Sequence, residues 1–213
     1  MVEMVLKIRH IGLEFDWLKQ EFTLVFLGEN MYNFEYEGKL KMDKFIPDIY
    51  QKSIFTIDYQ KLKKNGIKCL LFDLDNTLVP YKTCEPNAKI HELVAMLSDD
   101  FKVIIMSNSN KNRLRPFKEK LNIDVAYSSR KPLKKKYKKI LSLYGFKESE
   151  VACIGDQLMT DILGANNMGF TSILVNKIAP FEPLPTKINR FFEKIVRKKL
   201  AKKKILVVGE YYD

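Results

Sequence analysis

The fold that we expect for this chain is decided by the stretch KCLLFDLDNT, residues 68–77. It is a short apolar run that ends in two aspartates one residue apart, Asp73 and Asp75, and Pro80 follows closely. A run of this kind is typical of a buried strand in a parallel sheet. Alternate residues of a regular strand face the same side, so both carboxylates would face one site at its carboxyl end. Taken alone, the pair could also belong to a solvated turn.

Three further apolar runs end in polar residues in the same way. In a doubly wound α/β sheet, such strand ends converge on one crevice. A hydroxyl that binds phosphate oxygens, a lysine that balances charge and carboxylates for a divalent metal make up a phosphoryl-transfer site. Mg²⁺ suits clustered carboxylates, which repel one another unless a cation or a proton lies between them. The residues concerned are Ser107 and Asn108 after 102–106, Lys131 after 123–127, and Asp156 and Asp161 after 151–154.

In this order, the residues resemble the four motifs of the haloacid dehalogenase superfamily of aspartate-nucleophile phosphatases. The stretches DLDNTLV, SNS, KP and GDQLMTDILGAN, which begin at residues 73, 107, 131 and 155, are similar to those of the subfamily IIIA, YqeG-like phosphatases. The resemblance covers about Met42 to Val175. It implies a three-layer α/β fold, with a doubly wound parallel sheet and a Rossmann-like core.

The resemblance also implies a role for each motif residue. Asp73 would be the nucleophile that forms an aspartyl-phosphate, and Asp75 the acid/base that protonates the leaving oxygen and then activates water. Thr77 belongs to the same catalytic motif. The remaining roles are Mg²⁺ binding by Asp73, the Asp75 backbone carbonyl and Asp156, with Asp161 behind them, and phosphoryl binding by Ser107, Asn108 and Lys131.

The spacing of the motifs limits what can cover the site. Between Thr77 and Ser107 there is room for a loop, one helix over about 87–97 and a strand, and between Ser107 and Lys131 for one helix over about 111–121 and a strand. Neither gap can hold a cap domain. Capped relatives enclose small metabolites, so an uncapped site suggests a large or surface-held substrate such as a lipid, a protein or a nucleic acid.

The composition predicts one catalytic domain with appendages. The 213 residues are 46% hydrophobic, enough to bury one α/β core. No apolar stretch approaches the roughly 18 residues that span a bilayer, and charges at Glu3, Lys7 and Arg9 argue against a secretory signal, so we expect a cytoplasmic protein. Its three cysteines have no metal-ligand spacing, and we expect them to be reduced. We divide the chain into an extension over 1–41, a phosphatase core over 42–180 and a basic tail over 181–213.

The tail carries much of the net charge of +11. Residues 187–204 contain nine Lys or Arg and one acid, Glu193, and residues 130–139 add seven basic residues without an acid. Apolar residues recur in the tail on one face of a helix. Three interpretations stay open: a helix that packs on the domain, an interfacial helix on anionic lipid at the inner face of the membrane, and a nucleic-acid contact. The apolar positions are Ile188, Phe191, Phe192, Ile195, Val196 and Leu200.

Residues 1–41 match no motif. They alternate apolar and charged residues, which predicts a short strand or hairpin. Glu37-Gly38 lies shortly before Met42 and could be a translated ribosome-binding site. Met42 would then be the natural start of the protein.

The resulting expectation is a Mg²⁺-dependent phosphatase. The YqeG-like resemblance implies phosphatidylglycerophosphate as substrate, and an uncapped site with a basic, aromatic tail suits a lipid in an anionic membrane. One alternative is a phosphatase for a protein or nucleic-acid phosphate. Another is a membrane- or nucleic-acid-binding module whose site is idle, although the retention of Asp75 argues against it.

Overall fold

The computed structural model describes residues 6–8, 13–15, 42–207 and 209–213, and it divides into two units, Met1–Lys41 and Met42–Asp213. In the first unit, β1 (Leu6–Ile8) pairs with β2 (Leu13–Phe15) in antiparallel fashion. The expectation of short strands is confirmed for these two segments. The rest of what the sequence predicts for residues 1–41 lies outside the described residues.

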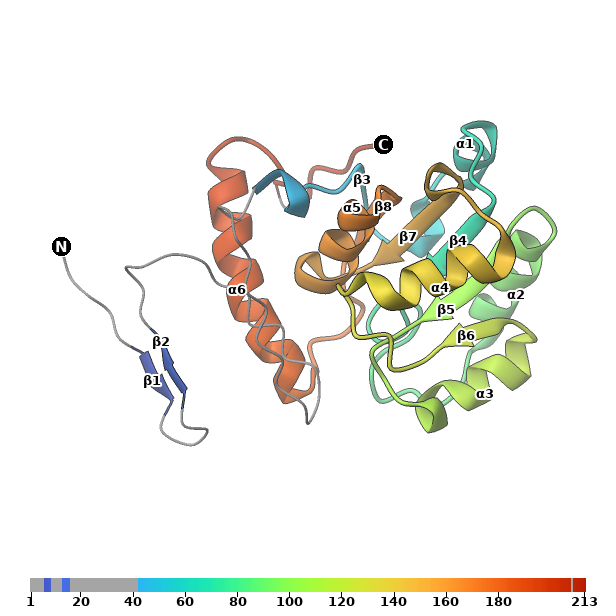
Figure 1. Ribbon diagram of the computed structural model, residues 1–213, viewed down its shortest axis with the longest axis horizontal. Coiled ribbons are helices and arrows are strands. Elements are labelled where there is room, and N and C mark those ends of the chain that lie inside the picture. Colours follow the sequence, from blue (N-terminus) through green and yellow to red (C-terminus); the bar gives the residue numbers. More distant parts are fainter. Residues whose placement is uncertain (1–5, 9–12, 16–41, 208) are drawn as a thin grey trace. The chain divides into compact units, whose positions relative to one another are not determined.

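The second unit is built on a six-stranded sheet in the order β3-β8-β7-β4-β5-β6, and every pairing is parallel (Figure 1). The chain runs outward from β4 through β5 to β6 and then returns to the other side of β4 as β7. The topological switch point therefore lies between β4 and β7, as expected for a doubly wound sheet. The strands are β3 (Ile49–Gln51), β4 (Cys69–Phe72), β5 (Lys102–Met106), β6 (Asp124–Ala126), β7 (Val151–Gly155) and β8 (Thr171–Val175).

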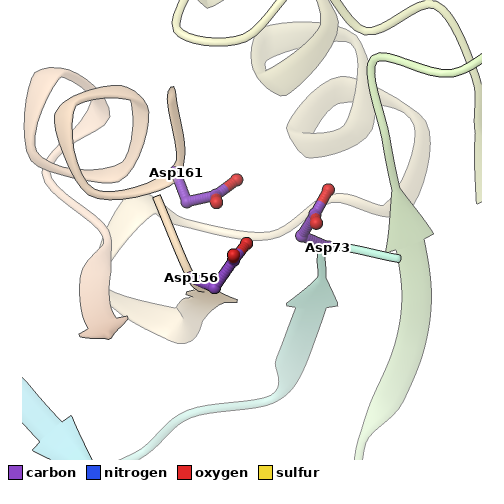
Figure 2. Close-up of side chains that lie close together, drawn as sticks. All are labelled: Asp73, Asp156 and Asp161. Atoms are coloured by element: carbon purple, nitrogen blue, oxygen red, sulfur yellow. The ribbon is translucent and has the colours of Figure 1, made fainter. Parts of the chain in front are cut away.

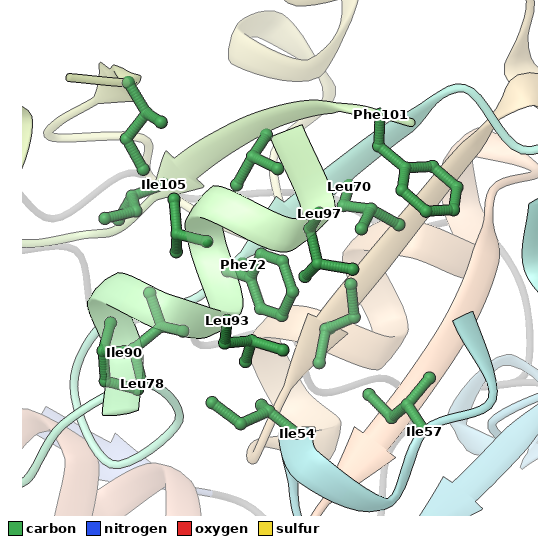
Figure 3. Packing of buried hydrophobic residues seen from close by; sticks show 14 of the residues in the cluster. Ile54, Ile57, Leu70, Phe72, Leu78, Ile90, Leu93, Leu97, Phe101 and Ile105 are labelled. Carbon is green, nitrogen blue, oxygen red and sulfur yellow. The ribbon is translucent and has the colours of Figure 1, made fainter. Parts of the chain in front are cut away.

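Helices cover both faces of this sheet and make the expected three layers. Alternate residues of β4 point to opposite faces, because the side-chain period of a strand is two. Leu70 and Phe72 pack against α2 and α3 in the larger core cluster (Figure 3), whereas Cys69 and Leu71 pack against α4 and α5. The helices are α1 (Tyr59–Lys64), α2 (Ala88–Ser98), α3 (Lys111–Leu121), α4 (Lys134–Tyr144), α5 (Leu163–Met168) and α6 (Leu184–Ala201), with the π-helical turn η4 (Leu158–Ile162) leading into α5 and the 3₁₀ turns η1 (Met42–Phe45), η2 (Ile54–Thr56) and η3 (Glu148–Glu150).

Two of the helices that begin at the carboxyl edge, α2 and α3, start where the sequence supplies a cap. The side chains of Asn87 and Asn110 accept hydrogen bonds from the backbone amides of Ile90 and Arg113, which fixes the first turns of α2 and α3. Each of these is the only helix in its connection, α2 between β4 and β5 and α3 between β5 and β6. Within residues 42–207, no additional domain is inserted, so the site at the carboxyl edge has no cap.

The elements that the sequence did not predict include β3 and α4. The edge strand β3 has only three residues, too few for a periodicity to be recognised. The basic run over 130–139 largely becomes the first turns of α4, whose apolar side is carried by Tyr137 and Ile140. The three cysteines are free, and Cys69 and Cys153 are buried in β4 and β7.

The C-terminal helix α6 packs on the second unit through part of its apolar stripe. Val196 and Leu200 are buried in a third cluster with Tyr50 and Leu174, whereas Leu184 and Phe191 are exposed. No helix in the described part of the chain combines the length and the apolar character needed to cross a membrane.

Candidate active site

Three buried carboxylates meet at the carboxyl edge of the sheet, on either side of the switch point (Figure 2). Asp73 follows β4, Asp156 follows β7 and Asp161 lies on the turn η4. One carboxylate oxygen of each residue lies within 4.8 Å of those of the other two. Carboxylate oxygens are the hard ligands that Mg²⁺ prefers, so the donor set fits a divalent cation.

Lys131 lies against two of these carboxylates. Its Nζ donates to Asp73 Oδ1 at 2.6 Å and to Asp161 Oδ1 at 2.6 Å. The backbone of Lys131 is held by Asn108, whose Oδ1 accepts from the Lys131 amide at 2.7 Å and whose Nδ2 donates to the Lys131 carbonyl at 3.3 Å. The ammonium group is therefore fixed beside the candidate nucleophile.

The carboxylates of this cluster are buried close to one another, which shifts the pKa values of its members. Burial raises the pKa of Asp73 well above its ordinary value; Lys131 opposes this, and Asp161 and Asp156 add to it. Burial alone lowers the pKa of Lys131, but Asp161 and Asp73 outweigh burial and leave it raised. Lys131 and Asp73 form a charged pair, because Lys131 Nζ lies 2.6 Å from Asp73 Oδ1 and both side chains are buried. A divalent cation among the three carboxylates would relieve their remaining repulsion.

Asp156 is held from two directions. The Thr77 hydroxyl donates to Asp156 Oδ1 at 3.2 Å, and the guanidinium of Arg190 on α6 donates to Asp156 Oδ2 and, at 2.8 Å, to its carbonyl oxygen. Burial raises the pKa of Asp156 to about 7, although Arg190 lowers it. Arg190 also contacts the buried Glu182 at 2.7 Å and Glu193 at 2.8 Å. The C-terminal helix is thus joined to the carboxylate cluster by a network of buried charges.

Gly155 is needed for the cluster to close. A Cβ atom at this position would lie 2.2 Å from Cγ of Asp161, closer than real contacts allow. The absence of a side chain lets Asp161 lie directly over the end of β7, where its Oδ2 accepts a hydrogen bond from the Gln157 amide at 3.1 Å.

Asp75 lies outside the group of three carboxylates, and its side chain is bound by α3 and the loop before it. Its Oδ2 accepts from the Ser109 hydroxyl at 2.7 Å. Its Oδ1 accepts from Nη2 and Nε of Arg113 at 2.7 and 3.2 Å. Arg113 binds one carboxylate oxygen and Ser109 binds the other, so the two contacts together fix the orientation of the Asp75 carboxylate.

The structure brings the eight residues predicted from the sequence to one edge of the sheet. Some of them form the carboxylate cluster, and the others lie around it. Asp73, Asp156, Asp161 and Lys131 form the buried cluster itself. Ser107 is buried at the end of β5, where its Oγ accepts from the Ser109 amide at 3.1 Å. Thr77 and Asn108 contact Asp156 and Lys131 respectively, and Asp75 is held by Arg113. The catalytic, metal-binding and substrate-binding roles themselves stay predictions.

Sequence reasoning missed the residues that hold the candidate catalytic groups. Ser109 belongs to the SNS stretch but has no role of its own in that motif, and Arg113 lies on a helix with no motif. Arg190 is one of nine basic residues in the tail, and nothing in their spacing distinguishes it. Glu182 and Glu193 belong to the same network.

Comparison with known proteins decides the family. The family model described as "Mitochondrial PGP phosphatase" matches residues 39–179. The chain belongs to this family. It is also 38% identical over 162 residues to "Probable phosphatase YqeG" of Bacillus subtilis, covering 75% of this chain and 93% of that protein. It is therefore a phosphatase of the haloacid dehalogenase type.

Two other proteins are less similar. "Phosphatidylglycerophosphate phosphatase 1, chloroplastic/mitochondrial" of Arabidopsis thaliana is 26% identical over 149 residues, which are 64% of this chain and 42% of that protein. Among solved structures, the cobalt-bound deoxy-D-mannose-octulosonate 8-phosphate phosphatase YrbI of Haemophilus influenzae matches with a TM-score of 0.44 and 15% identity, over 69% of this chain and 96% of that one.

Proposed function

We propose that this PGP phosphatase family member hydrolyses the phosphomonoester of phosphatidylglycerophosphate through a phosphorylated Asp73. The observation that carries the phosphatase chemistry is the buried cluster of Asp73, Asp156 and Asp161 with Lys131 at 2.6 Å from two of its carboxylates. The substrate is supported by the description of the family, by the Arabidopsis relative and by a site without a cap domain.

In the first step, a carboxylate oxygen of Asp73 attacks phosphorus and the bond to the leaving oxygen breaks, while the carboxylic acid of Asp75 gives its proton to that oxygen. In the second step, water attacks the aspartyl-phosphate, Asp75 takes its proton and the Asp73–phosphate bond breaks. Lys131 holds Asp73 in place and can neutralise phosphoryl oxygens as charge develops on them. The Ser107 hydroxyl and the loop around Asn108 complete the phosphoryl site.

Asp73, Asp156 and the Asp75 carbonyl would hold Mg²⁺, with Asp161 beside them. When bound, the ion neutralises the charge of the carboxylates and of the phosphoryl group. Thr77 and Arg190 keep Asp156 oriented toward the cluster, and Asn108 keeps Lys131 there.

The test is phosphate release with Mg²⁺ from phosphatidylglycerophosphate in vesicles, compared with release from a soluble phosphomonoester. We expect the chain to hydrolyse the lipid and the Asp73→Asn variant to hydrolyse neither substrate. Activity on the soluble ester alone would retain the phosphatase and remove the lipid substrate. Equal activity of the Asp73→Asn variant would remove the proposed nucleophile.

A further inference from the structure

Exposed apolar side chains gather in one stretch that begins at the active-site edge. Of nine large apolar side chains exposed among the described residues, four lie within residues 178–191. Single exposed apolar residues are ordinary on a protein surface, but a group of them marks a contact site. We call this group, Ile178, Phe181, Leu184 and Phe191, the apolar rim.

The apolar rim is anchored to the loop that carries the candidate nucleophile. The amide of Ile178 donates to the Asn76 carbonyl at 3.1 Å, and the Asn76 side chain donates to the Phe181 carbonyl at 3.1 Å. The ring of Phe181 packs against Tyr81, with a centroid distance of 5.9 Å. Because β8 is parallel to β4 and β7, its continuation into the rim leaves the sheet at the same edge as the carboxylate cluster.

The exposed face of α6 continues the rim with lysines. Leu184, Lys187, Phe191, Lys194 and Lys198 are all exposed and follow one another at intervals of three and four, which places them on a single face of the helix. Lys82 adds a cation 4.2 Å from the centre of the Phe181 ring. This face therefore combines apolar side chains with amines.

The acids of this region do not offset the lysines at the surface. Between residues 177 and 204 the sequence has two acids, Glu182 and Glu193, and both are buried in ion pairs with Arg190. Arg197 pairs with Glu193 as well, at 2.8 Å. The positive charge that α6 presents to solvent is consequently carried mainly by its exposed lysines, which is complementary to a polyanionic partner.

We infer that the apolar rim and the exposed face of α6 dock the protein on an anionic phospholipid bilayer, with the carboxylate cluster at the membrane side. Lysines attract the anionic head groups, and leucine, isoleucine and phenylalanine enter the boundary between head groups and acyl chains. A nucleic acid in water would satisfy the lysines but would offer no apolar layer for Leu184 or Ile178. This inference rests on the proposed lipid substrate for its biological meaning, but binding can be measured without turnover.

The experiment compares two double variants of the full chain by co-sedimentation with vesicles of phosphatidylcholine alone and of phosphatidylcholine mixed with phosphatidylglycerol. Leu184→Gln/Phe191→Gln removes two rim side chains that are 71% and 54% exposed. The matched control, Leu143→Gln/Met96→Gln, removes side chains that are 67% and 57% exposed. Both control residues lie in the last turns of α4 and α2, which run from the carboxyl edge of the sheet toward the opposite edge.

We expect the unchanged chain and the control to bind the anionic vesicles, and the rim variant to bind about tenfold or more weakly, because two apolar side chains no longer enter the bilayer. All three should hydrolyse a soluble phosphomonoester at the same rate. Equal vesicle binding by the rim variant and the control would overturn the inference. So would binding to single-stranded DNA at the same salt that exceeds vesicle binding and is unchanged in the rim variant.

The outcomes also separate this inference from the proposed substrate. Vesicle binding that depends on the rim, without phosphate release from phosphatidylglycerophosphate, would support the proposed docking surface and exclude the proposed substrate. Hydrolysis of that lipid at equal rates by the rim variant and the control, with no measurable vesicle binding by either protein, would support the proposed substrate and exclude the proposed docking surface.

Discussion

Replacement of Arg190 by methionine should destabilise the protein in a way that depends on Mg²⁺. Methionine keeps most of the length and apolar volume of the arginine stem but removes its charge. Glu182 would keep its ion pair with Lys177, and Glu193 would keep its ion pair with Arg197. Asp156 would lose the guanidinium that contacts it. The effect therefore concentrates on one fully buried carboxylate.

The magnitude follows from the burial of that carboxylate. Breaking a buried ion pair by removing one partner costs about 3–5 kcal/mol. In a chain of this size each kcal/mol lowers Tm by about 2–4 °C, so the Arg190→Met variant should melt about 6–20 °C lower without metal. Saturating Mg²⁺ supplies a cation to Asp156 and should recover about 1.5–3 kcal/mol, the net value of a hydrogen bond to a charged group.

The assay is thermal unfolding of both proteins with a chelator and with excess Mg²⁺. Arg197→Met is the matched control, because Arg197 lies on the same helix and pairs with Glu193 without contacting the carboxylate cluster. Its loss should cost about 1 kcal/mol or less, as for a partly exposed ion pair, and the cost should be the same with and without Mg²⁺. A deficit in Arg190→Met that Mg²⁺ does not reduce would refute the link between α6 and the carboxylates proposed to bind Mg²⁺.

Three further predictions concern the same edge of the sheet. Arg113→Gln should slow the hydrolysis of an alkyl phosphate about tenfold and that of an aryl phosphate much less, because an aryl leaving group needs little help from the acid Asp75. The control Arg115→Gln, which alters an exposed arginine on the same helix, should change neither rate. Equal losses on both esters in Arg113→Gln would contradict the role given to Arg113. Gly155→Ala should cost about 1–3 kcal/mol in chemical denaturation and weaken Mg²⁺ binding measured by calorimetry, because its Cβ would displace Asp161; unchanged binding would show that the contact relaxes without moving the carboxylate. Removal of divalent metal by a chelator should stop phosphate release and lower Tm, and added Mg²⁺ should restore both; full activity in the chelator would exclude the proposed metal site.

The fold could be predicted largely because each central strand carries its own signal. β4, β5, β7 and β8 are short apolar runs that are buried on both faces, and polar residues end each of them. The prediction for α3 agrees with the structure at both ends, since Asn110 caps its start and Asn122 ends it in a left-handed conformation. β3 could not be found in this way, because it joins the sheet through its pairing with β8, a contact between residues more than 100 positions apart.

The residues of the candidate site could likewise be predicted where they follow a strand, but not where they lie on an α-helix. Asp73, Ser107, Lys131 and Asp156 could be placed together because each follows a strand, and the parallel order of the strands brings their ends to one edge. Arg113 and Arg190 could not be placed, because each reaches its carboxylate from a helix, and the sequence does not say which face of that helix meets the site. The net charge of the tail, when it is counted from the sequence, is reduced by Glu193. In the structure Glu193 is buried, so it does not offset the lysines at the surface.

The contacts of α6 also bear on how the tail would meet a membrane. A free amphipathic helix would have to leave the domain, which uncovers to water the side of the third cluster formed by Tyr50 and Leu174 and withdraws Arg190 from Asp156 at about 3–5 kcal/mol. Only Phe191 and Leu184, with the lysines of the same face, are available without that cost. Docking through the outward face while the helix stays packed needs no such rearrangement, and it leaves Asp156 oriented for catalysis. On these magnitudes, a rigid helix that binds lipid on one side and the carboxylate cluster on the other is favoured over a tail that detaches and lies alone in the bilayer.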